Sequence, residues 1–502
     1  MPLATPVATP ATAAAKPATA TAPVAAQPPT AMATPIAPFS DADWTWLNGN
    51  PRNHDTPLAM KYFVPEIRVD TNYNLDFNHP ADDTISVSSE IFRAQEIQVE
   101  QLGLGGDFLL DHVHARFMTQ FGMYSVTTPR NDGSPARGQW DLDNAYRYVS
   151  EAYGGYHWDK MHGINLDAGI FMSYIGLFSY YNFDNWAYQP SFVSSNTPWF
   201  FNGIRGQFFP TAHLKIEPWF INGWQSYGRF NSKPGMGGQI KWTPKPWINI
   251  VSNNYGYGED SLGNANRSRL HTDNSVEVKY YDKPSATLDK MAFSLTGDAG
   301  CETGDGVSCH GNSVTNGNVN YKQSFLGWML YNRWWFNKDR YAITVGGGQI
   351  NNPGRYLVLV PPINGATAIT GTPYFTENPG NQFHAMDGTV TYDFMPRQYI
   401  TFRTEYGYRH AAVPYWTGRG GMTPPGGTTS SPVGNPADYL CLNNGVATDS
   451  GIGYGTPLTG VGSVAASCGG GTSSSAAALG HIWFPDLRRD EQKITFALMV
   501  KF

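Results

Sequence analysis

Residues 493–502, KITFALMVKF, show the clearest strand pattern in the chain. Alternate residues form one face consisting of Ile494, Phe496, Leu498, Val500 and Phe502. The intervening residues form a second face consisting of Lys493, Thr495, Ala497, Met499 and Lys501. A period of two predicts a β-strand with two different surroundings. The first face suits lipid, whereas the second is mixed and carries both charges.

The same alternation occurs elsewhere in the chain. Residues 399–409 place Ile400 and Phe402 on one face and Arg403 and Glu405 on the other. Residues 67–77 oppose apolar and polar positions in the same way. Strands with two unlike faces also build soluble β-sandwiches, in which the polar face meets water. The alternation therefore predicts strands but does not by itself distinguish a sandwich from a barrel.

The amino-acid composition favours a protein whose surface faces lipid. Charged residues make up 15% and aromatic residues 14% of the 502 residues, whereas a soluble domain carries roughly a quarter charged residues. No apolar run approaches the ~20 residues that a transmembrane helix needs. Strands that cross lipid must close into a barrel, because every backbone N–H and C=O group has to be paired. The net charge of -6 is mild and the cations are scattered, so nucleic acid is not expected as a partner.

The alternation of short and long connections favours a barrel over a sandwich. Candidate strands are centred near residues 71, 101, 119, 151, 169, 204, 219, 239, 252, 278, 295, 330, 346, 389, 404 and 498, and short and long connections alternate between them. We predict an all-β fold, a transmembrane antiparallel β-barrel of about 16 strands with short periplasmic turns and long extracellular loops. Fourteen and eighteen strands remain alternatives to this count. The apolar phase switches between Val99 and Leu102, as a β-bulge would make it do.

Three parts are expected along the chain. Residues 1–40 form an Ala/Pro/Thr-rich leader that cannot bury a core, residues 41–64 an entry segment, and residues 65–502 the barrel. The amino terminus lacks the charged and apolar regions of a secretory signal. We therefore expect either that a signal has been removed or that the start is misassigned. The expected location of the protein is the bacterial outer membrane.

The four cysteines lie in two pairs within Gly/Ser/Thr/Asn-rich stretches. They are Cys301 and Cys309, then Cys441 and Cys468. Two disulfides in long loops are expected, which requires an oxidising compartment; free thiols or crossed pairing are the alternatives. Histidines at ligand spacing do not flank them, and His112 with His114 has no third ligand, so neither a metal nor a cofactor is expected.

Particular stretches resemble a known family. Residues 168–257, which include GIFMSYIGLFSYYNFDNWAYQP (169–190), look like the putative OmpL-like β-barrel porin-2 family of Gram-negative bacteria. The entry residues 43–58 (DWTWLNGNPRNHDTPL) are similar to the segment before the first strand in that family, and terminal Phe502 resembles the terminal aromatic of outer-membrane barrels. The resemblance covers most of residues 43–410. It implies an outer-membrane location and a porin-like role, but it assigns no catalytic or binding residue.

The inner face of such a barrel carries its selectivity. The pore-lining candidates are Arg116, Arg147, Glu151, Arg205, Lys215, Glu217, Lys241, Arg333, Asp387, Arg403, Glu405 and Arg409. They could instead be structural pairs that brace neighbouring strands. The aromatic residues 177–198 are a candidate constriction loop inside the lumen, or else an ordinary external loop. Residues 44–46 could also tuck under the barrel mouth.

We therefore expect an outer-membrane porin, a water-filled channel for passive diffusion of small hydrophilic solutes or ions. Its partners would be outer-membrane lipid, those solutes and, in a homotrimer, two further copies of the chain. One alternative is a surface structural protein or adhesin whose long loop 411–489 binds a partner. Another is a lipid hydrolase in a barrel, but GxSxG and HExxH motifs are missing, so an enzyme is not expected.

Overall fold

The computed structural model describes residues 37–80, 83–85, 88–129, 132, 140–229, 233–259, 266–304, 306–311, 313–315, 318–352, 383–412, 416–419, 440–443, 446–449 and 488–502. Sixteen strands close into one antiparallel barrel in chain order, so the expected fold class and strand number are confirmed. The strands are β1 (Phe63–Asp76), β2 (Ile97–Leu110), β3 (Val113–Thr119), β4 (Val149–Trp158), β5 (Ile164–Met172), β6 (Phe200–Thr211), β7 (Leu214–Ile221), β8 (Gly235–Lys245), β9 (Ile248–Glu259), β10 (Ser268–Asp282), β11 (Leu288–Thr303), β15 (Ser324–Phe336), β16 (Tyr341–Asn352), β17 (Phe383–Arg397), β18 (Ile400–Ala411) and β21 (Asp490–Lys501).

The last strand closes the barrel against the first. β21 pairs with β1 from Lys493 opposite Asp76 to Lys501 opposite Arg68. Its predicted faces are confirmed, because Phe496 and Leu498 are exposed on the outer surface while Thr495 and Met499 are buried. The first hairpin contains the expected bulge: Asp70 pairs with Gln101 and Thr71 with Val99, which leaves one extra residue on β2.

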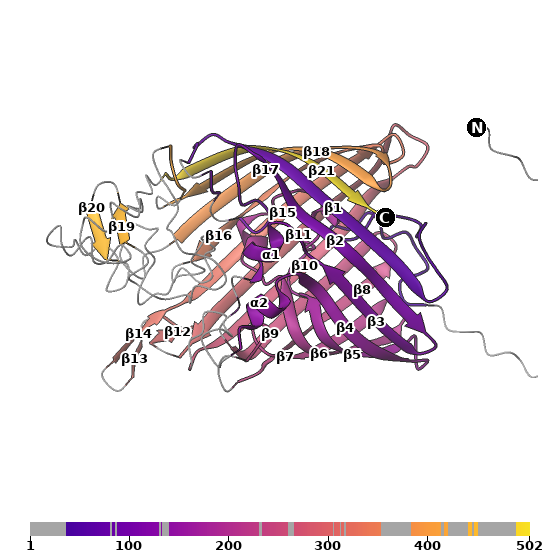
Figure 1. Ribbon diagram of the computed structural model, residues 1–502, viewed down its shortest axis with the longest axis horizontal. Coiled ribbons are helices and arrows are strands. Elements are labelled where there is room, and N and C mark those ends of the chain that lie inside the picture. The colour runs from indigo at the N-terminus through magenta and orange to yellow at the C-terminus, as the bar shows by residue number, and fades with distance from the viewer. Residues whose placement is uncertain are drawn as a thin grey trace, which may run out of the picture. The chain divides into compact units, whose positions relative to one another are not determined.

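The connections differ at the two ends of the barrel. The turns β2–β3, β4–β5, β6–β7, β8–β9, β10–β11, β15–β16 and β17–β18 are short, and β1 begins and β21 ends at the same end (Figure 1). The other end holds the long connections, which include the small sheet of β12 (Val307–Ser308), β13 (Ser313–Thr315) and β14 (Asn318–Lys322) and the pair β19 (Leu440–Asn443) and β20 (Val446–Asp449). Among the described residues no helix is long and apolar enough to cross a bilayer.

Candidate functional site

A long loop between β5 and β6 folds into the lumen. This inner loop, residues 173–199, contains the 3-10 helix η3 (Asn182–Asp184) and the helix α3 (Phe192–Ser195). Every residue from Tyr180 to Trp199 is buried. The loop lies against inward-facing side chains of many strands, so the prediction that residues 177–198 fold into the lumen is confirmed.

Carboxylates on β17 and β18 hold the backbone of the inner loop. Glu405 accepts hydrogen bonds from the N–H groups of Tyr188 (2.6 Å) and Gln189 (2.8 Å). Asp387 accepts from the N–H of Phe192 (2.9 Å) and from the hydroxyl of Ser191 (2.8 Å). Hydrogen bonds to an ionised acceptor are stronger than neutral ones. These two carboxylates therefore fix the middle of the loop to the barrel wall.

Arginines on β15 and β18 hold the carbonyl groups of the same loop. Arg403 donates to the carbonyl of Asn185 (2.6 Å), Arg333 to that of Trp186 (3.0 Å), and Arg409 to that of Pro190 (2.8 Å). Asp393 on β17 joins Arg333 and Arg403, at 2.7 Å from a nitrogen of each. The charged side chains of β15, β17 and β18 named so far therefore bond either the inner loop or an arginine that bonds it.

β1 extends this arrangement around the barrel. Arg68 donates to the carboxylate of Asp184 at 2.9 Å. Asp70 accepts from Asn182 (2.9 Å) and from the hydroxyl of Tyr188 (2.8 Å). Burial raises the pKa of the Asp184 carboxyl above its ordinary value, and the adjacent Arg68 guanidinium opposes that rise. We call β1 together with β15–β18 the loop-bearing wall.

A second segment crosses the lumen near the short turns. At one end the N–H of Phe39 donates to the carbonyl of Ala212 in the β6–β7 turn (2.8 Å). At the other, Arg52 donates to the carbonyl of Ile400 beside the β17–β18 turn (2.6 Å). In the order of the barrel these turns follow the sixth and the fourteenth strands, eight strands apart in a ring of sixteen, so they lie opposite each other.

This strap, residues 39–52, is fastened to the inner loop and to the wall between its ends. Asn48 donates its N–H to Glu277 on β10 (2.8 Å) and accepts from the N–H of Trp186 (2.7 Å). The indole N–H of Trp186 donates to the carbonyl of Trp46 (3.1 Å). Trp46 is fully buried. The expectation that residues 44–46 tuck under the barrel mouth is therefore confirmed.

Two cavities lie along the opposite wall. The central cavity, of about 320 Å³, is bounded by the strap, the start of the inner loop and side chains of β6–β10. The mouth cavity, of about 500 Å³, is bounded by β1–β6 and by Asp111 and His112 in the β2–β3 turn. Arg205 and Gln207 on β6 line both. We call β2–β10 the cavity-bearing wall.

Arg205 is held rigidly between the two cavities. Its guanidinium bonds Asp167 on β5 at 2.8 Å. The rings of Tyr153 and Phe171 lie 4.7 and 4.5 Å from its Cζ atom. Planar stacking with aromatic rings suits arginine, whose weak hydration makes partial burial inexpensive. The side chain thus presents a fixed positive charge where the cavities meet.

Glu217 on β7 gathers donors in the central cavity. It accepts from Lys215 (2.6 Å), from the amide of Gln207 (2.7 Å) and from the indole of Trp219 (2.7 Å). The pairing of Lys215 with Glu217 fits the alternative interpretation, in which charges brace the sheet, and both side chains also line the cavity. A lumen residue can therefore serve both roles.

The twelve pore-lining candidates fall into distinct places. Arg205, Lys215, Glu217 and Lys241 line the central cavity, and Arg116 and Arg205 line the mouth cavity. Glu151 bonds Arg116 (3.0 Å) and the hydroxyl of Tyr181 (2.6 Å). The residues that bind the inner loop instead are Arg333, Asp387, Arg403, Glu405 and Arg409.

Arg147 lies outside the strands, because it follows the helix α2 (Leu142–Tyr146) in the connection before β4. The candidate set left out Gln207, Gln239 and Asn249, which also line the central cavity. The alternation of each strand places all three on its inner face, but they carry no charge, and the predicted set contains charged residues alone. The role of each candidate in conduction stays a prediction.

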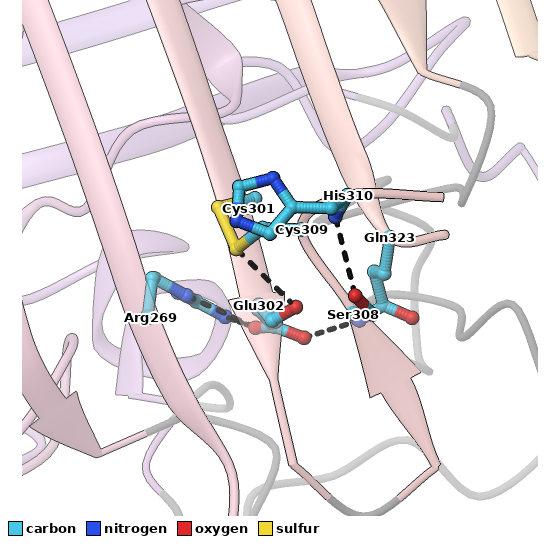
Figure 2. The surroundings of a disulfide bond; sticks show 7 residues. All are labelled: Arg269, Cys301, Glu302, Ser308, Cys309, His310 and Gln323. Atoms are coloured by element: carbon cyan, nitrogen blue, oxygen red, sulfur yellow. Dashed lines mark hydrogen bonds and ion pairs between the residues drawn. A yellow bond between two sulfur atoms is a disulfide. The ribbon is translucent and has the colours of Figure 1, made fainter. Parts of the chain in front are cut away.

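One predicted disulfide is present at the outer end of β11. Cys301 and Cys309 are joined, with their Cα atoms 5.1 Å apart. Figure 2 shows the bond beside Glu302, which accepts from Arg269 on β10 (2.6 Å) and from Gln323. Cys441 lies in β19, but Cys468 falls outside the described residues, so that pairing stays a prediction.

Sequence comparison finds one family. The sequence model of the family described as "Putative beta-barrel porin-2, OmpL-like" matches residues 68–431. No curated protein sequence matches this chain.

Among solved structures, the chain is similar to the outer membrane channel DcaP of Acinetobacter baumannii, with 10% identity over 88% of this chain and 97% of that one (TM-score 0.45). It is also similar to an anion-selective porin from Comamonas acidovorans, with 9% identity over 88% and 99% of the two chains (TM-score 0.42). OprB of Pseudomonas putida matches with 10% identity over 88% and 94% (TM-score 0.43).

Proposed function

We propose that this chain, which belongs to the putative β-barrel porin-2, OmpL-like family, is an outer-membrane porin through which small hydrophilic solutes or ions diffuse passively. These solutes pass along the cavity-bearing wall. The observation that carries this proposal is the sharing of Arg205 and Gln207 by the central and mouth cavities. Solute in one cavity therefore meets the same two side chains as solute in the other.

The loop-bearing wall supports the same route by contrast. Its inward charges bind the inner loop, and Arg333, Arg403 and Glu405 are each at most 4% exposed. A solute on that side would have to displace hydrogen bonds to charged groups, each worth about 1.5–3 kcal/mol. Along the cavity-bearing wall it meets polar side chains that already border open space.

The small volume of the cavities limits what passes. A central cavity of about 320 Å³ lies at the lower end of ordinary ligand sites. The amides of Gln207 and Gln239 and the charges of Lys215 and Glu217 can replace part of the hydration shell of a polar solute. Small hydrophilic molecules and hydrated ions fit this lining better than apolar ones do.

Chemical block of a single lumen thiol tests the route. In planar bilayers, a methanethiosulfonate carrying a trimethylammonium group is expected to lower the conductance of Gln207→Cys by about twofold or more, since the added group fills the shared boundary of both cavities. The matched control is Thr389→Cys, an inward residue of β17 that is 7% exposed. The wild-type protein with the reagent gives the background from the native cysteines.

If the conductance of Gln207→Cys is unchanged although mass spectrometry confirms its modification, the route along the cavity-bearing wall is contradicted. A block in Thr389→Cys alone would place it along the loop-bearing wall. The adhesin alternative depends on loop 411–489, most of which lies outside the described residues, and it stays a hypothesis.

The size of the barrel also leads us to propose a homotrimer in the membrane. Its test is the mass of the detergent-extracted protein by light scattering, corrected for bound detergent. A mass of three chains supports the proposal, and a mass of one chain contradicts it.

A further inference from the structure

Two lysines face each other in the wall of the central cavity. Lys215 on β7 pairs directly with Lys241 on β8 in the strand register. Both line the cavity. Like charges directly opposite on neighbouring strands destabilise a sheet. An arrangement of this kind is unfavourable in the protein alone and becomes favourable when an anion lies between the two ammonium groups.

The carboxylates around the cavity leave Lys241 without an ion-pair partner among the described residues. The central cavity is lined by three cations, Arg205, Lys215 and Lys241, and by two carboxylates, Glu217 and Glu277. Glu217 is engaged by Lys215 at 2.6 Å. Within the described part of the chain no ion pair is formed by Lys241, whose Nζ atom lies 5.3 Å from the centre of the Phe39 ring. A ring face attracts the cation but cannot neutralise it.

Glu277 is committed to other partners. It accepts from the N–H of Asn48 on the strap (2.8 Å) and from the amide of Asn249 on β9 (2.8 Å). Arg205 is paired with Asp167 and Lys215 with Glu217, so Lys241 is the cation of the cavity that no carboxylate among the described residues bonds.

The same cavity is lined by buried polar atoms suited to hydroxyl groups. Asn48 and Asn249 are 4% and 2% exposed. The side-chain nitrogen of Asn48 and the side-chain oxygen of Asn249 have no hydrogen-bond partner among the described residues. Their neighbours fix both amide orientations, because Asn48 accepts from Trp186 through its oxygen and Asn249 donates to Glu277 through its nitrogen. Buried polar groups in native proteins are nearly always paired. A hydroxylated solute can supply one acceptor and one donor.

We propose that the central cavity is a binding site for small hydroxylated carboxylates, with the carboxylate between Lys241 and Lys215 and the hydroxyl groups toward Asn48 and Asn249. This inference rests on the proposed route, since it names the class of solute that the route favours. Gln207 and Gln239 offer further amide groups to the same solute. The ammonium group of Lys241 favours the acid over a neutral sugar of the same size.

Gluconate and glucose are matched probes, because they share a carbon skeleton and differ in charge. Saturation-transfer NMR on the folded protein detects weak binding without any need for conduction. We expect gluconate to give the stronger signal. Its apparent affinity should fall about threefold in Lys241→Met, as the loss of one partly exposed ion pair predicts.

Three variants make the result specific. Lys241→Arg keeps the charge and should keep gluconate binding. Lys245→Met removes a lysine from the exposed end of the same strand and should leave binding unchanged. Glucose should bind equally to all the variants. Since Lys241→Met relieves a repulsion, it is expected to fold at least as well as the wild type.

The binding measurement tests the anion site and the conductance measurement tests the route, so each can be overturned without the other. Equal binding of gluconate to the wild type and to Lys241→Met, or a preference for glucose, overturns the anion site even where thiol block at Gln207 confirms the route. In the opposite case, gluconate binding depends on Lys241 but thiol block at Gln207 leaves the conductance unchanged. That outcome supports the site and overturns the route.

Discussion

The two walls of the lumen carry similar side chains and use them differently. On the loop-bearing wall, Arg403 and Glu405 bond the backbone of the inner loop. On the cavity-bearing wall, Arg205 and Glu217 border open volume. Strand alternation places all four on the inner face. What separates them is whether another segment of the chain covers them, so an inward charge is not by itself a pore-lining charge.

The largest expected effect tests whether the loop-bearing wall is structural. Arg403→Met removes one partner of Asp393 and two donors to the inner loop. Breaking a buried pair from one side costs about 3–5 kcal/mol, because the remaining charge is left uncompensated. Urea unfolding of the refolded barrel should show a loss of this size in the free energy of unfolding.

Arg116→Met on the cavity-bearing wall is the matched control. Arg116 pairs with Glu66 (3.2 Å), Asp107 (3.0 Å) and Glu151 (3.0 Å), and it lines the mouth cavity. Water in that cavity can solvate the carboxylates that remain, so we expect less than half the loss seen for Arg403→Met. Equal losses would erase the distinction between the walls.

A pH titration probes the packing above the inner loop. Glu90, in the connection between β1 and β2, is 1% exposed and bonded by the Ser89 hydroxyl, which lies 3.2 Å from the Ser195 hydroxyl of the inner loop. Burial raises the pKa of Glu90 to about 8, while Ser89 and the charge of Arg409 oppose the rise. The folded state thus holds this proton more tightly than the unfolded chain does.

The sign of the pH effect follows from that difference. The stability contributed by Glu90 is complete below its unfolded pKa of 4.5 and is lost as the pH rises through about 8. We expect the free energy of unfolding, measured with urea, to fall by an amount on the order of a few kcal/mol across this range. Glu90→Gln should flatten the profile, whereas Glu96→Gln, at a solvent-facing carboxylate of the same connection, should not. An unchanged slope in Glu90→Gln would assign the titration to another group.

The sequence predicts the sixteen strands because strand alternation is local. It also predicts the inward side of Arg403, Glu405 and Arg205. It does not predict their partners, since the bond from Tyr188 to Glu405 joins residues 217 apart and the bond from Asn48 to Glu277 joins residues 229 apart. Such pairs follow from where two inner segments lie in the closed barrel, and no local pattern encodes that.

The smallest expected effect lies at the strap, which bounds the central cavity together with the start of the inner loop. Gly49 has φ +77°, and a Cβ atom there would lie 2.7 Å from the carbonyl oxygen of Leu177. Gly49→Ala therefore meets both an unfavourable backbone conformation and a clash with backbone, and should cost about 1–3 kcal/mol. Gly297→Ala on β11 is the control, since no atom lies within 4 Å of its added Cβ. Because the strap bounds the central cavity, its displacement should also raise the single-channel conductance of Gly49→Ala. A destabilised Gly49→Ala with wild-type conductance would show that the strap braces the barrel without restricting flow.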